Sequence, residues 1–510
     1  MKSFIGIDFG ACNIKAAKVS STGKIQKIKL NKNQSGGNVI PNVILYEKII
    51  DKNSGSEKIE IKVGKGAKNN TLDLENKIWQ IKPKLSQKNW SKYIKNLGRE
   101  VTAFEAVKDI FEWLWKTIIE KSSKDEDYDV TITVPVSFSE VQKNLIKQAA
   151  IDAGIPVTSV IMESFAAMFS LEEFLEESEE ETVLIFDFGG STLDLSLFKI
   201  ERNDDELNLT ELAAAGLKFG GIDIDKAILE NIFKVKYADD VEKILQNGTP
   251  VNELKELIER MKEAIFIDDG ETTTDSINDN NGNLYEFTLT PEEIISVLEK
   301  IKIKEKIIFL LDELFDDAEI DKSEVTAVKP FGGTVSIDYF LQMLTDYFGE
   351  DIFDCDDLDK EEIYMGIAVG AAKYGYIKNQ NDSSITIQNV IPYSIGLVKN
   401  ETFNRYIKRN ELSGFTTPLK SLLISELEKN NWRVSVYQSF SNEFDLPLEN
   451  EEVVFIGDVE LDKNLYTVND AVLFNLRTDG VGKIYFKTFE LQPEKDEPVF
   501  VEEKIVKVGG

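Results

Sequence analysis

One short pattern occurs twice in this chain, and it constrains the fold more than any other feature. Residues 5–15 read IGIDFGACNIK, and residues 182–200 read TVLIFDFGGSTLDLSLFKI. Each copy runs from an apolar strand through Asp-Phe-Gly into a turn of small residues, and the second copy continues into an alternating strand. The chain is therefore predicted to contain two copies of one β-hairpin.

Turns of this composition are suited to binding phosphate groups. A tight hairpin built from glycine and other small residues exposes backbone N–H groups in a concavity, where they hold an anion without bulky side chains. Asp8 and Asp187 end the strands just before the two turns, and their carboxylate oxygens are suited to hold Mg²⁺ through its waters. Two such turns facing each other would grip a phosphate chain from both sides. One turn alone would be weak support, because many ordinary β-turns look alike.

The rest of the first half alternates predicted strands and helices. Residues 129–134 (DVTITV) form a strand-like run, and Ser139 with Gln142 then makes a capping-box pattern for a helix that ends at Gly154. Residues 103–119 place apolar side chains at the spacing of a one-sided helix. This alternation predicts an α/β architecture with largely parallel strand pairing.

The composition changes along the second half. Residues 172–181 are rich in glutamate, which is typical of a solvated connection. Residues 378–384 (KNQNDSS) are polar and are predicted to be a linker. Beyond them come short alternating runs separated by turn residues, namely NWRVSVYQ, VVFIGDVEL and KIYFKTFEL. These runs predict a separate all-β domain with no long helix after it.

Charge and the absence of one residue type exclude several functions. The net charge of -32 makes nucleic acid and acidic membrane surfaces poor partners. The chain contains no histidine, which excludes a Ser-His-Asp triad and a HExxH zinc site. Its two cysteines, Cys12 and Cys355, are too few for a disulfide framework and fit a reducing compartment. We find no secretory segment and no apolar run of the roughly 18 residues that a spanning helix needs, and we expect a cytoplasmic protein.

The order of the motifs resembles a known family. The nucleotide-binding domain of the DnaK-type seventy-kilodalton heat-shock chaperones, an actin-like ATPase fold, is similar to this chain at IGIDFGACN, IKPKL, TITVPVSFSEVQK, VIMESFAAM, LIFDFGGSTLD, KFGGIDID, ERMKEA, FGGTVS and MGIAVGAA. The later stretch NVIPYSIGL, with the strands that follow it, resembles the β-sandwich peptide-binding domain of the same family.

The resemblance implies a domain organisation. An α/β, actin-like nucleotide-binding domain would occupy residues 1–380, with two ribonuclease-H-like lobes at about 1–178 and 182–380. A linker would follow over residues 381–390, and a small β-sandwich substrate-binding-like domain over 391–510. The helical lid of the family is expected to be missing.

The resemblance also implies catalytic and metal-binding roles. Lys82 in WQIKPKL matches the lysine that polarises the γ-phosphate and the attacking water, and Glu163 in MESFAAM matches the glutamate that orients that water. Thr192 would place its hydroxyl near the γ-phosphate. Asp8 and Asp187 would hold Mg²⁺, and Asp187 counts among the catalytic residues as well. From the residues alone, Lys82 also fits a surface lysine, and Glu163 fits a first-turn helix carboxylate.

Nucleotide binding would fall mainly to the small-residue turns. The implied set is Gly10, Ala11, Cys12, Asn13, Gly189, Gly190, Ser191, Gly220, Gly221, Gly332 and Gly333. The glycine pairs among them also fit plain structural turns. Glu259 and Lys262 lie three apart in ERMK, on one helix face, and match the pair that holds the ribose. Pro135 and Lys143 match the residues that relay the nucleotide state to the β domain, with Lys143 standing where arginine is usual.

The chain departs from the family pattern at further positions. Ala11 and Cys12 replace two threonines of the first phosphate turn, and each missing hydroxyl bond to a phosphate would cost roughly 1.5 to 3 kcal/mol. Glu263 and Ser336 stand where many members place arginines against the adenine, so the base preference stays open. Trp432 in NWRVSVYQ falls near the client pocket and either fills it or is ordinary core.

Three functional hypotheses follow. The leading one is an ATP-dependent chaperone-like protein that binds and slowly hydrolyses ATP with Mg²⁺, with K⁺ as a further candidate cofactor, and that couples the cleft to a peptide-binding β domain. The second is a nucleotide-binding interaction module that does not hydrolyse ATP. The third and least favoured is a small-molecule kinase built on the actin-like core. Expected partners are ATP or ADP, extended peptide clients or a dedicated protein partner, and a J-domain protein or exchange factor.

Overall fold

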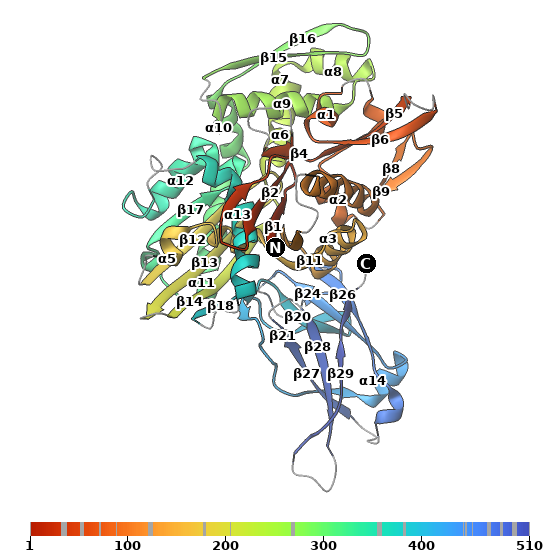
Figure 1. The fold of residues 1–510 in the computed structure, drawn as a ribbon, viewed down its shortest axis with the longest axis vertical. Coiled ribbons are helices and arrows are strands. Elements are labelled where there is room, and N and C mark those ends of the chain that lie inside the picture. Colours follow the sequence, from red (N-terminus) through yellow and green to blue (C-terminus); the bar gives the residue numbers. More distant parts are fainter. Residues whose placement is uncertain are drawn as a thin grey trace.

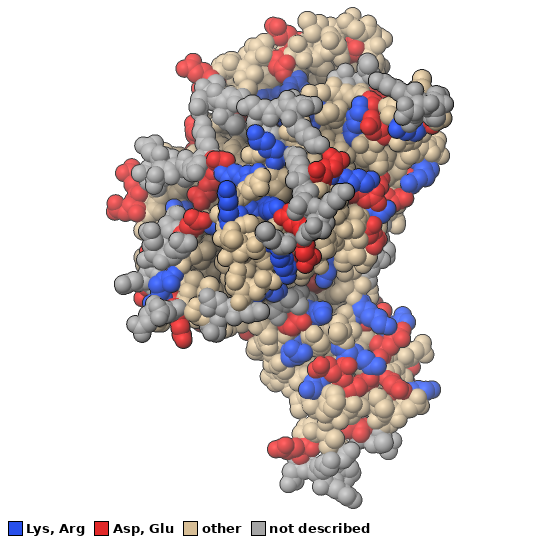
Figure 2. Space-filling model, in the orientation of Figure 1, with Lys and Arg blue, Asp and Glu red and all other residues tan. Residues whose placement is uncertain are grey.

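The computed structural model describes most of the chain. The described residues are 2–31, 38–50, 56–70, 73–87, 89–120, 126–176, 180–203, 206–266, 271–353, 360–380, 384–441, 443, 446–450, 452–466, 471–479, 483–491 and 497–508. Figure 1 shows a broad upper body of helices and sheets above a narrower part made mainly of strands. Figure 2 shows acidic and basic side chains interspersed on this face of both parts.

Two sheets form the centre of the upper body. The first has the order β11-β10-β1-β2-β3, with β4 also paired to β2, and the second has the order β17-β12-β13-β14-β18. Their bounds are β1 Lys2–Phe9, β2 Asn13–Ser20, β3 Ile25–Lys27, β4 Val39–Pro41, β10 Asp127–Val134, β11 Val157–Met162, β12 Glu180–Phe188, β13 Leu193–Asn203, β14 Glu206–Leu217, β17 Ala327–Phe331 and β18 Ile385–Gln388.

The two sheets repeat one arrangement. In the first sheet β1 pairs with β10 in parallel and with β2 in antiparallel, and in the second β12 pairs with β17 in parallel and with β13 in antiparallel. The hairpins β1–β2 and β12–β13 are the two copies predicted from the sequence. The predicted α/β class is confirmed, but the prediction of largely parallel pairing is wrong. The long ladders of the second sheet, β12–β13 and β13–β14, are antiparallel, and so are β1–β2, β2–β3 and β2–β4 of the first.

Smaller sheets and helices surround this centre. The remaining strands of the upper body are β5 Val43–Ile50, β6 Glu57–Val63, β7 Lys77–Trp79, β8 Ser91–Ile94, β9 Arg99–Thr102, β15 Thr273–Asn278 and β16 Leu284–Leu289. Its α-helices are α1 Lys65–Lys68, α2 Ala103–Ile119, α3 Glu140–Asp152, α4 Glu163–Met168, α5 Glu172–Glu176, α6 Gly221–Ile228, α7 Lys234–Lys236, α8 Ala238–Gln246, α9 Val251–Phe266, α10 Pro291–Lys300, α11 Ile303–Ala318, α12 Asp338–Phe348 and α13 Lys360–Gln380. No helix in the described ranges combines the length and the apolar character needed to cross a membrane.

Capping groups set the ends of two predicted helices, α2 and α3. Thr102 accepts a hydrogen bond from the backbone of Glu105 at the start of α2, which spans the predicted residues. Ser139 and Gln142 form the predicted capping box of α3, and Gly154 follows that helix with a φ of 81°. The glutamate-rich stretch differs from the prediction, because its first part forms the short helix α5.

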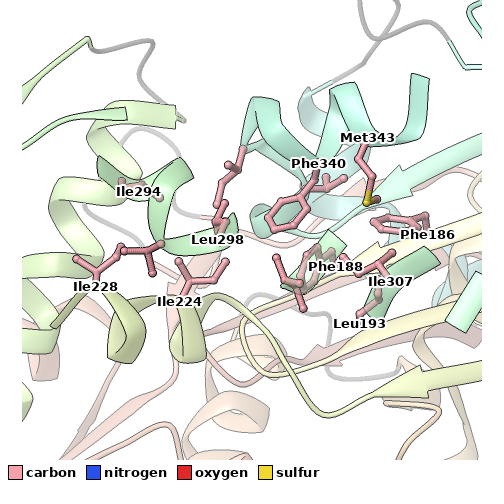
Figure 3. Packing of buried hydrophobic residues seen from close by; sticks show 14 of the residues in the cluster. Phe186, Phe188, Leu193, Ile224, Ile228, Ile294, Leu298, Ile307, Phe340 and Met343 are labelled. Carbon is pink, nitrogen blue, oxygen red and sulfur yellow. The ribbon is translucent and has the colours of Figure 1, made fainter. Parts of the chain in front are cut away.

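The second sheet packs against helices through a large apolar core (Figure 3). Phe188 at the end of β12 and Leu193 at the start of β13 are fully buried. Phe188 contacts Phe340 of α12, with ring centroids 4.8 Å apart, and Ile224 of α6 belongs to the same core. Because these contacts hold both ends of its turn, the second hairpin has a fixed position relative to α6 and α12.

Helix α13 joins the two sheets by packing closely on both. It contacts β1, β2 and β10 of the first sheet and β17 of the second. A Cβ atom at Gly6 of β1 would lie 2.1 Å from the carbonyl oxygen of Ala368, and one at Gly370 of α13 would lie 1.8 Å from that of Ala166. Glycine is therefore required at these positions, because backbone occupies the space of a side chain.

The lower part consists of two facing sheets and the short helix α14 Ile424–Lys429. One has the order β25-β21-β20-β24-β26-β30 and the other β23-β27-β28-β29, and a separate pair joins β19 and β22. Bounds are β19 Val390–Ile391, β20 Ser394–Lys399, β21 Thr402–Ile407, β22 Glu411–Leu412, β23 Lys420–Leu423, β24 Arg433–Ser439, β25 Leu446–Pro447, β26 Val453–Glu460, β27 Ala471–Thr478, β28 Ile484–Glu490, β29 Val499–Ile505 and β30 Lys507–Val508. Leu397 and Val436, in the sheet that contains β20 and β24, share a buried core with Phe474 and Phe486 in the sheet that contains β27 and β28. This packing is that of a β-sandwich.

Two predictions for this part need correction. Trp432 is not in a strand, because β24 begins at Arg433 and Trp432 has a left-handed φ of 60°; its ring stacks on Tyr466 at 5.2 Å. The polar stretch predicted as a linker is also partly structured. Residues 378–380 complete α13, and Ile385–Gln388 form β18, which adds to the second sheet beside β14. Residues 381–383 lie outside the described ranges.

Direct contacts connect the upper body to the lower part. Arg409 Nε and Asn410 Nδ2 donate hydrogen bonds to Asp317 of α11, at 2.6 and 3.0 Å. The backbone N–H of Glu140 donates to Gln438 Oε1 at 2.9 Å, and the hydroxyl of Tyr393 bonds the Glu140 carboxylate. Both lobes of the upper body therefore bind the lower part.

We predict that Gly370→Ala destabilises the protein by about 1 to 3 kcal/mol, the range for overpacking. The new methyl group would displace the backbone of Ala166. Gly66→Ala is the matched control, since Gly66 also lies in a helix but has no atom within 4 Å of the new Cβ; we expect it to be neutral or stabilising by up to about 1 kcal/mol. Urea denaturation measures both, and equal stability of the two variants would contradict the packing of α13.

A second prediction concerns Glu211, which is fully buried on β14 and accepts a hydrogen bond from the N–H of Val390 at 3.1 Å. Burial raises the pKa of its carboxyl group from 4.5 to about 7. The folded state then binds the proton more tightly than the unfolded chain, so this carboxyl contributes stability below about pH 4.5 that is lost as the pH rises through about 7.

We expect Glu211→Gln to remove this dependence. Between pH 5 and pH 8 the free energy of unfolding of the wild type should fall by about 2 to 3 kcal/mol more than that of the variant. The thermal midpoint of the wild type should fall further for the same reason. Glu206→Gln, at an exposed position of the same strand, should behave as the wild type. A parallel pH response of wild type and Glu211→Gln would contradict the assignment.

Candidate functional site

A cavity lies between the two hairpins and gathers almost all of the predicted site residues. Its lining includes Asp8, Gly10, Ala11, Cys12, Asn13, Lys82, Glu163, Asp187, Gly189, Gly190, Ser191, Thr192, Gly221, Glu259, Lys262, Gly332 and Gly333. Gly220 is the exception and packs behind the second turn, where a Cβ atom would lie 2.5 Å from the backbone of Gly190. Residues from distant parts of the sequence therefore meet at one place.

The two turns touch each other without a bulky side chain between them. A Cβ atom at Gly190 would lie 2.4 Å from the sulfur of Cys12, so Cys12 fills the space that glycine leaves open. Burial raises the pKa of the Cys12 thiol well above its usual range, and the nearby Glu259 adds to the shift. Cys12 is a packed side chain and not an activated nucleophile.

Other segments hold the carbonyl groups of both turns. Asn42 Nδ2 donates to the carbonyl of Gly10 at 2.7 Å, and Thr334 Oγ1 donates to the carbonyl of Gly189 at 2.8 Å. The backbone N–H of Ile222 donates to the carbonyl of Gly190 at 2.8 Å. These hydrogen bonds hold the backbone of both turns in place, and turns of small residues are suited to bind an anion through backbone N–H groups.

Lys82 and Glu163 form a buried ion pair at the floor of the cavity. Lys82 begins the short helix at Lys82–Ser86 and is 1% exposed, so the alternative of a surface lysine is wrong. Glu163 is the first residue of α4 and is also buried. The pair belongs to the cavity wall and not to the outer surface.

The carboxylate of Glu163 and two others beside this pair lie close enough to share a cation. One oxygen each from Glu163, Asp187 and Asp194 lies within 4.8 Å of the others. Burial and the neighbouring acids raise the pKa of all three carboxyl groups, that of Asp194 to about 7. Val136 N–H donates to Asp194 Oδ1 at 2.7 Å, whereas Asp194 Oδ2 is buried without a partner among the described residues. This set of oxygen ligands fits Mg²⁺.

Asp8 has a different environment from the one expected. Its carboxylate bonds the ammonium group of Lys15 at 2.8 Å, on the strand directly opposite it. Lys15 was not among the predicted site residues, although the register of a hairpin with this turn would have placed it across from Asp8. The assignment of Asp8 to the metal stays a prediction.

The other end of the cavity is formed by α9 and its neighbours. Lys262 Nζ bonds Asp225 at 2.6 Å and the carbonyl of Gly221 at 3.0 Å, and Glu259 pairs with Lys68 at 3.3 Å. The lining also includes Glu263, Phe266, Ile337, Tyr364 and Ile367. Ser336 is not among the lining residues. The aromatic residues here were not predicted from the sequence, since nothing local distinguishes a cavity aromatic from a core one.

Comparisons with known proteins agree with this geometry. A family profile described as "Hsp70 protein" matches residues 4–445. A chaperone protein DnaK from Stenotrophomonas maltophilia (strain R551-3) is 25% identical over 468 residues, which cover 86% of this chain and 69% of that relative. The profile covers more than half of the chain and includes both hairpins.

We predict that Lys82→Met costs about 3 to 5 kcal/mol of stability, because it leaves Glu163 buried without its counter-ion. The double variant Lys82→Met/Glu163→Gln should regain much of this stability. Lys84→Met, in the same short helix but partly exposed, is the control and should cost little. Urea denaturation at neutral pH measures all three, and a double variant no more stable than Lys82→Met would contradict the pairing.

Proposed function

This chain belongs to the Hsp70 family, and we propose that it binds ATP with Mg²⁺ between its two hairpins, hydrolyses it slowly, and couples the state of the cleft to its β-sandwich. Members of this family are ATP-dependent chaperones with an actin-like ATPase fold and a β-sandwich, and this chain has the same two-part architecture. The finer roles of its residues follow from their places in the cavity.

One observation carries the proposal. The Lys82–Glu163 ion pair and Asp187 line a cavity walled by two phosphate-type turns, and the carboxylate of Asp194 is buried beside them. Such a set can position a γ-phosphate and a water molecule while excluding other solvent. Bound Mg²⁺ would neutralise charge on the phosphate oxygens.

Each residue then has a role consistent with its place. Lys82 would polarise the γ-phosphate, and Glu163, held by Lys82, would orient the attacking water. Asp187 and Asp8 would hold the waters of Mg²⁺. The buried hydroxyl of Thr192 would donate to the γ-phosphate. Glu259 and Lys262 would contact the ribose from the face of α9 that lines the cavity.

A chain of contacts supports coupling between the cavity and the β-sandwich. Asp194 accepts a hydrogen bond from Val136, which follows Pro135 and leads into α3. On α3, Lys143 pairs with Glu140 at 3.0 Å and lies over the ring of Tyr393 at 5.0 Å. Movement of the phosphate end of the cavity would reach the lower part by this route. We propose Pro135 and Lys143 as relay residues on this basis.

A second function is favoured by one feature. Ala11 and Cys12 give the first turn no hydroxyl group, so ATP could bind without efficient hydrolysis and the protein would act as a nucleotide-dependent interaction module. The kinase alternative has no comparable support. Extended peptides, a J-domain protein or exchange factor, K⁺ and a cytoplasmic location remain parts of the chaperone proposal.

Single-turnover hydrolysis tests the catalytic roles. Lys82→Ala and Asp187→Asn should each slow release of phosphate from bound ATP about 100-fold or more, whereas Lys84→Ala should not. Calorimetric titration with ATP, ADP, GTP and AMP-PNP in Mg²⁺ gives affinity and base preference for the same proteins. Unchanged hydrolysis in both site variants would refute the catalytic assignment. A wild type that binds ATP tightly but releases no phosphate would establish the second function instead.

A further inference from the structure

Lys15 is a buried lysine that the proposed roles leave unused. It lies on β2, is 8% exposed, and lines the cavity between the hairpins. Its ammonium group bonds Asp8 Oδ2 at 2.8 Å. A lysine is rarely buried without a specific reason, because its charge must be compensated.

The repeated hairpin shows what is unusual about this position. The first copy reads Asp-Phe-Gly-Ala-Cys-Asn-Ile-Lys from Asp8 to Lys15, and the second reads Asp-Phe-Gly-Gly-Ser-Thr-Leu-Asp from Asp187 to Asp194. In both copies the last residue is the cross-strand partner of the first. Lys15 therefore occupies the place that Asp194 has in the second hairpin.

The two copies also differ in their turns, and the differences are complementary. The second turn contains the hydroxyl groups of Ser191 and Thr192, whereas Ala11 and Cys12 leave the first turn without one. An ammonium group has three N–H donors, and among the described residues Asp8 is its only hydrogen-bond partner. The ammonium group of Lys15, on β2, can therefore supply hydrogen-bond donors that the first turn lacks.

The charges that line the cavity also favour a phosphate contact at Lys15. Its phosphate end is lined by the carboxylates of Asp8, Glu163 and Asp187 and by the ammonium groups of Lys15 and Lys82. Lys82 is already paired with Glu163. Without Lys15, a phosphate chain would enter beside an unpaired Asp8 and meet additional repulsion.

We propose that Lys15 is a phosphate-binding residue of this site. Held in place by Asp8, its ammonium group donates to the phosphate oxygens of the nucleotide and supplies the donors that Ala11 and Cys12 cannot. The first hairpin thus binds phosphate by charge where the second uses hydroxyl groups. This inference rests on the proposed nucleotide function and assigns one further residue to it.

Calorimetric titration of Lys15→Met with ADP, ATP and adenosine in Mg²⁺ tests this role. ADP and ATP should bind about 10- to 100-fold more weakly than to the wild type, the range for losing a charge-assisted hydrogen bond. Adenosine, which has no phosphate, should bind with unchanged affinity. Lys18→Met is the matched control, because Lys18 lies on the same strand but pairs with Glu126 and does not line the cavity; it should leave all three affinities unchanged.

Two further variants separate binding from folding. Asp8→Asn/Lys15→Met removes the unpaired acid, so it should stay folded and still bind ADP weakly. Lys15→Met/Cys12→Ser should regain part of the ADP affinity, because a hydroxyl returns to the first turn. Equal ADP affinity in the wild type and Lys15→Met, or an equal loss for adenosine and ADP, would overturn the proposal. A wild type that binds neither ADP nor ATP would refute the nucleotide function itself.

Discussion

The close contact between the two Asp-Phe-Gly turns is the constraint on which the rest of the structure depends. Cys12 and Gly190 meet where a second side chain would not fit, so the two sheets can approach only if both turns consist of small residues. Helix α13 and the core around Phe188 then hold the sheets at this separation. The cavity, its buried ion pair and its carboxylates exist because the turns face each other at this distance.

The cavity also explains how a strongly acidic protein can bind an anionic ligand. The net charge is -32, but the cavity is lined by the buried Lys15 and Lys82 and the partly buried Lys262, each paired with a carboxylate. Burial strengthens these local charges relative to the distant surface, which solvent and salt screen. The same buried network reaches α3 through Asp194 and Val136, and α3 contacts the β-sandwich. These contacts form a continuous path from the cavity to the lower part.

Features that depend on local sequence could be predicted, and features that depend on tertiary pairing could not. The two hairpins and helices α2 and α3 carry their own turn, periodicity or capping signals, and most predicted site residues line the cavity because those motifs fix their position. Strand β18 forms only because β14 offers an edge, and its polar neighbours resemble a linker. Trp432 was predicted in a strand, but its left-handed backbone depends on the turn before β24. Predicting Lys15 as a site residue would have required the strand register of the first hairpin, because no motif marks this lysine.

Amide hydrogen exchange tests most directly whether the two turns hold one phosphate chain between them. The full-length protein would be compared with AMP-PNP and Mg²⁺, with adenosine and Mg²⁺, and without ligand. We predict that AMP-PNP slows exchange in both turns together, at residues 10–13 and 189–192, and that adenosine slows neither. Protection of one turn only, or of neither with AMP-PNP bound, would contradict a phosphate site formed by both hairpins.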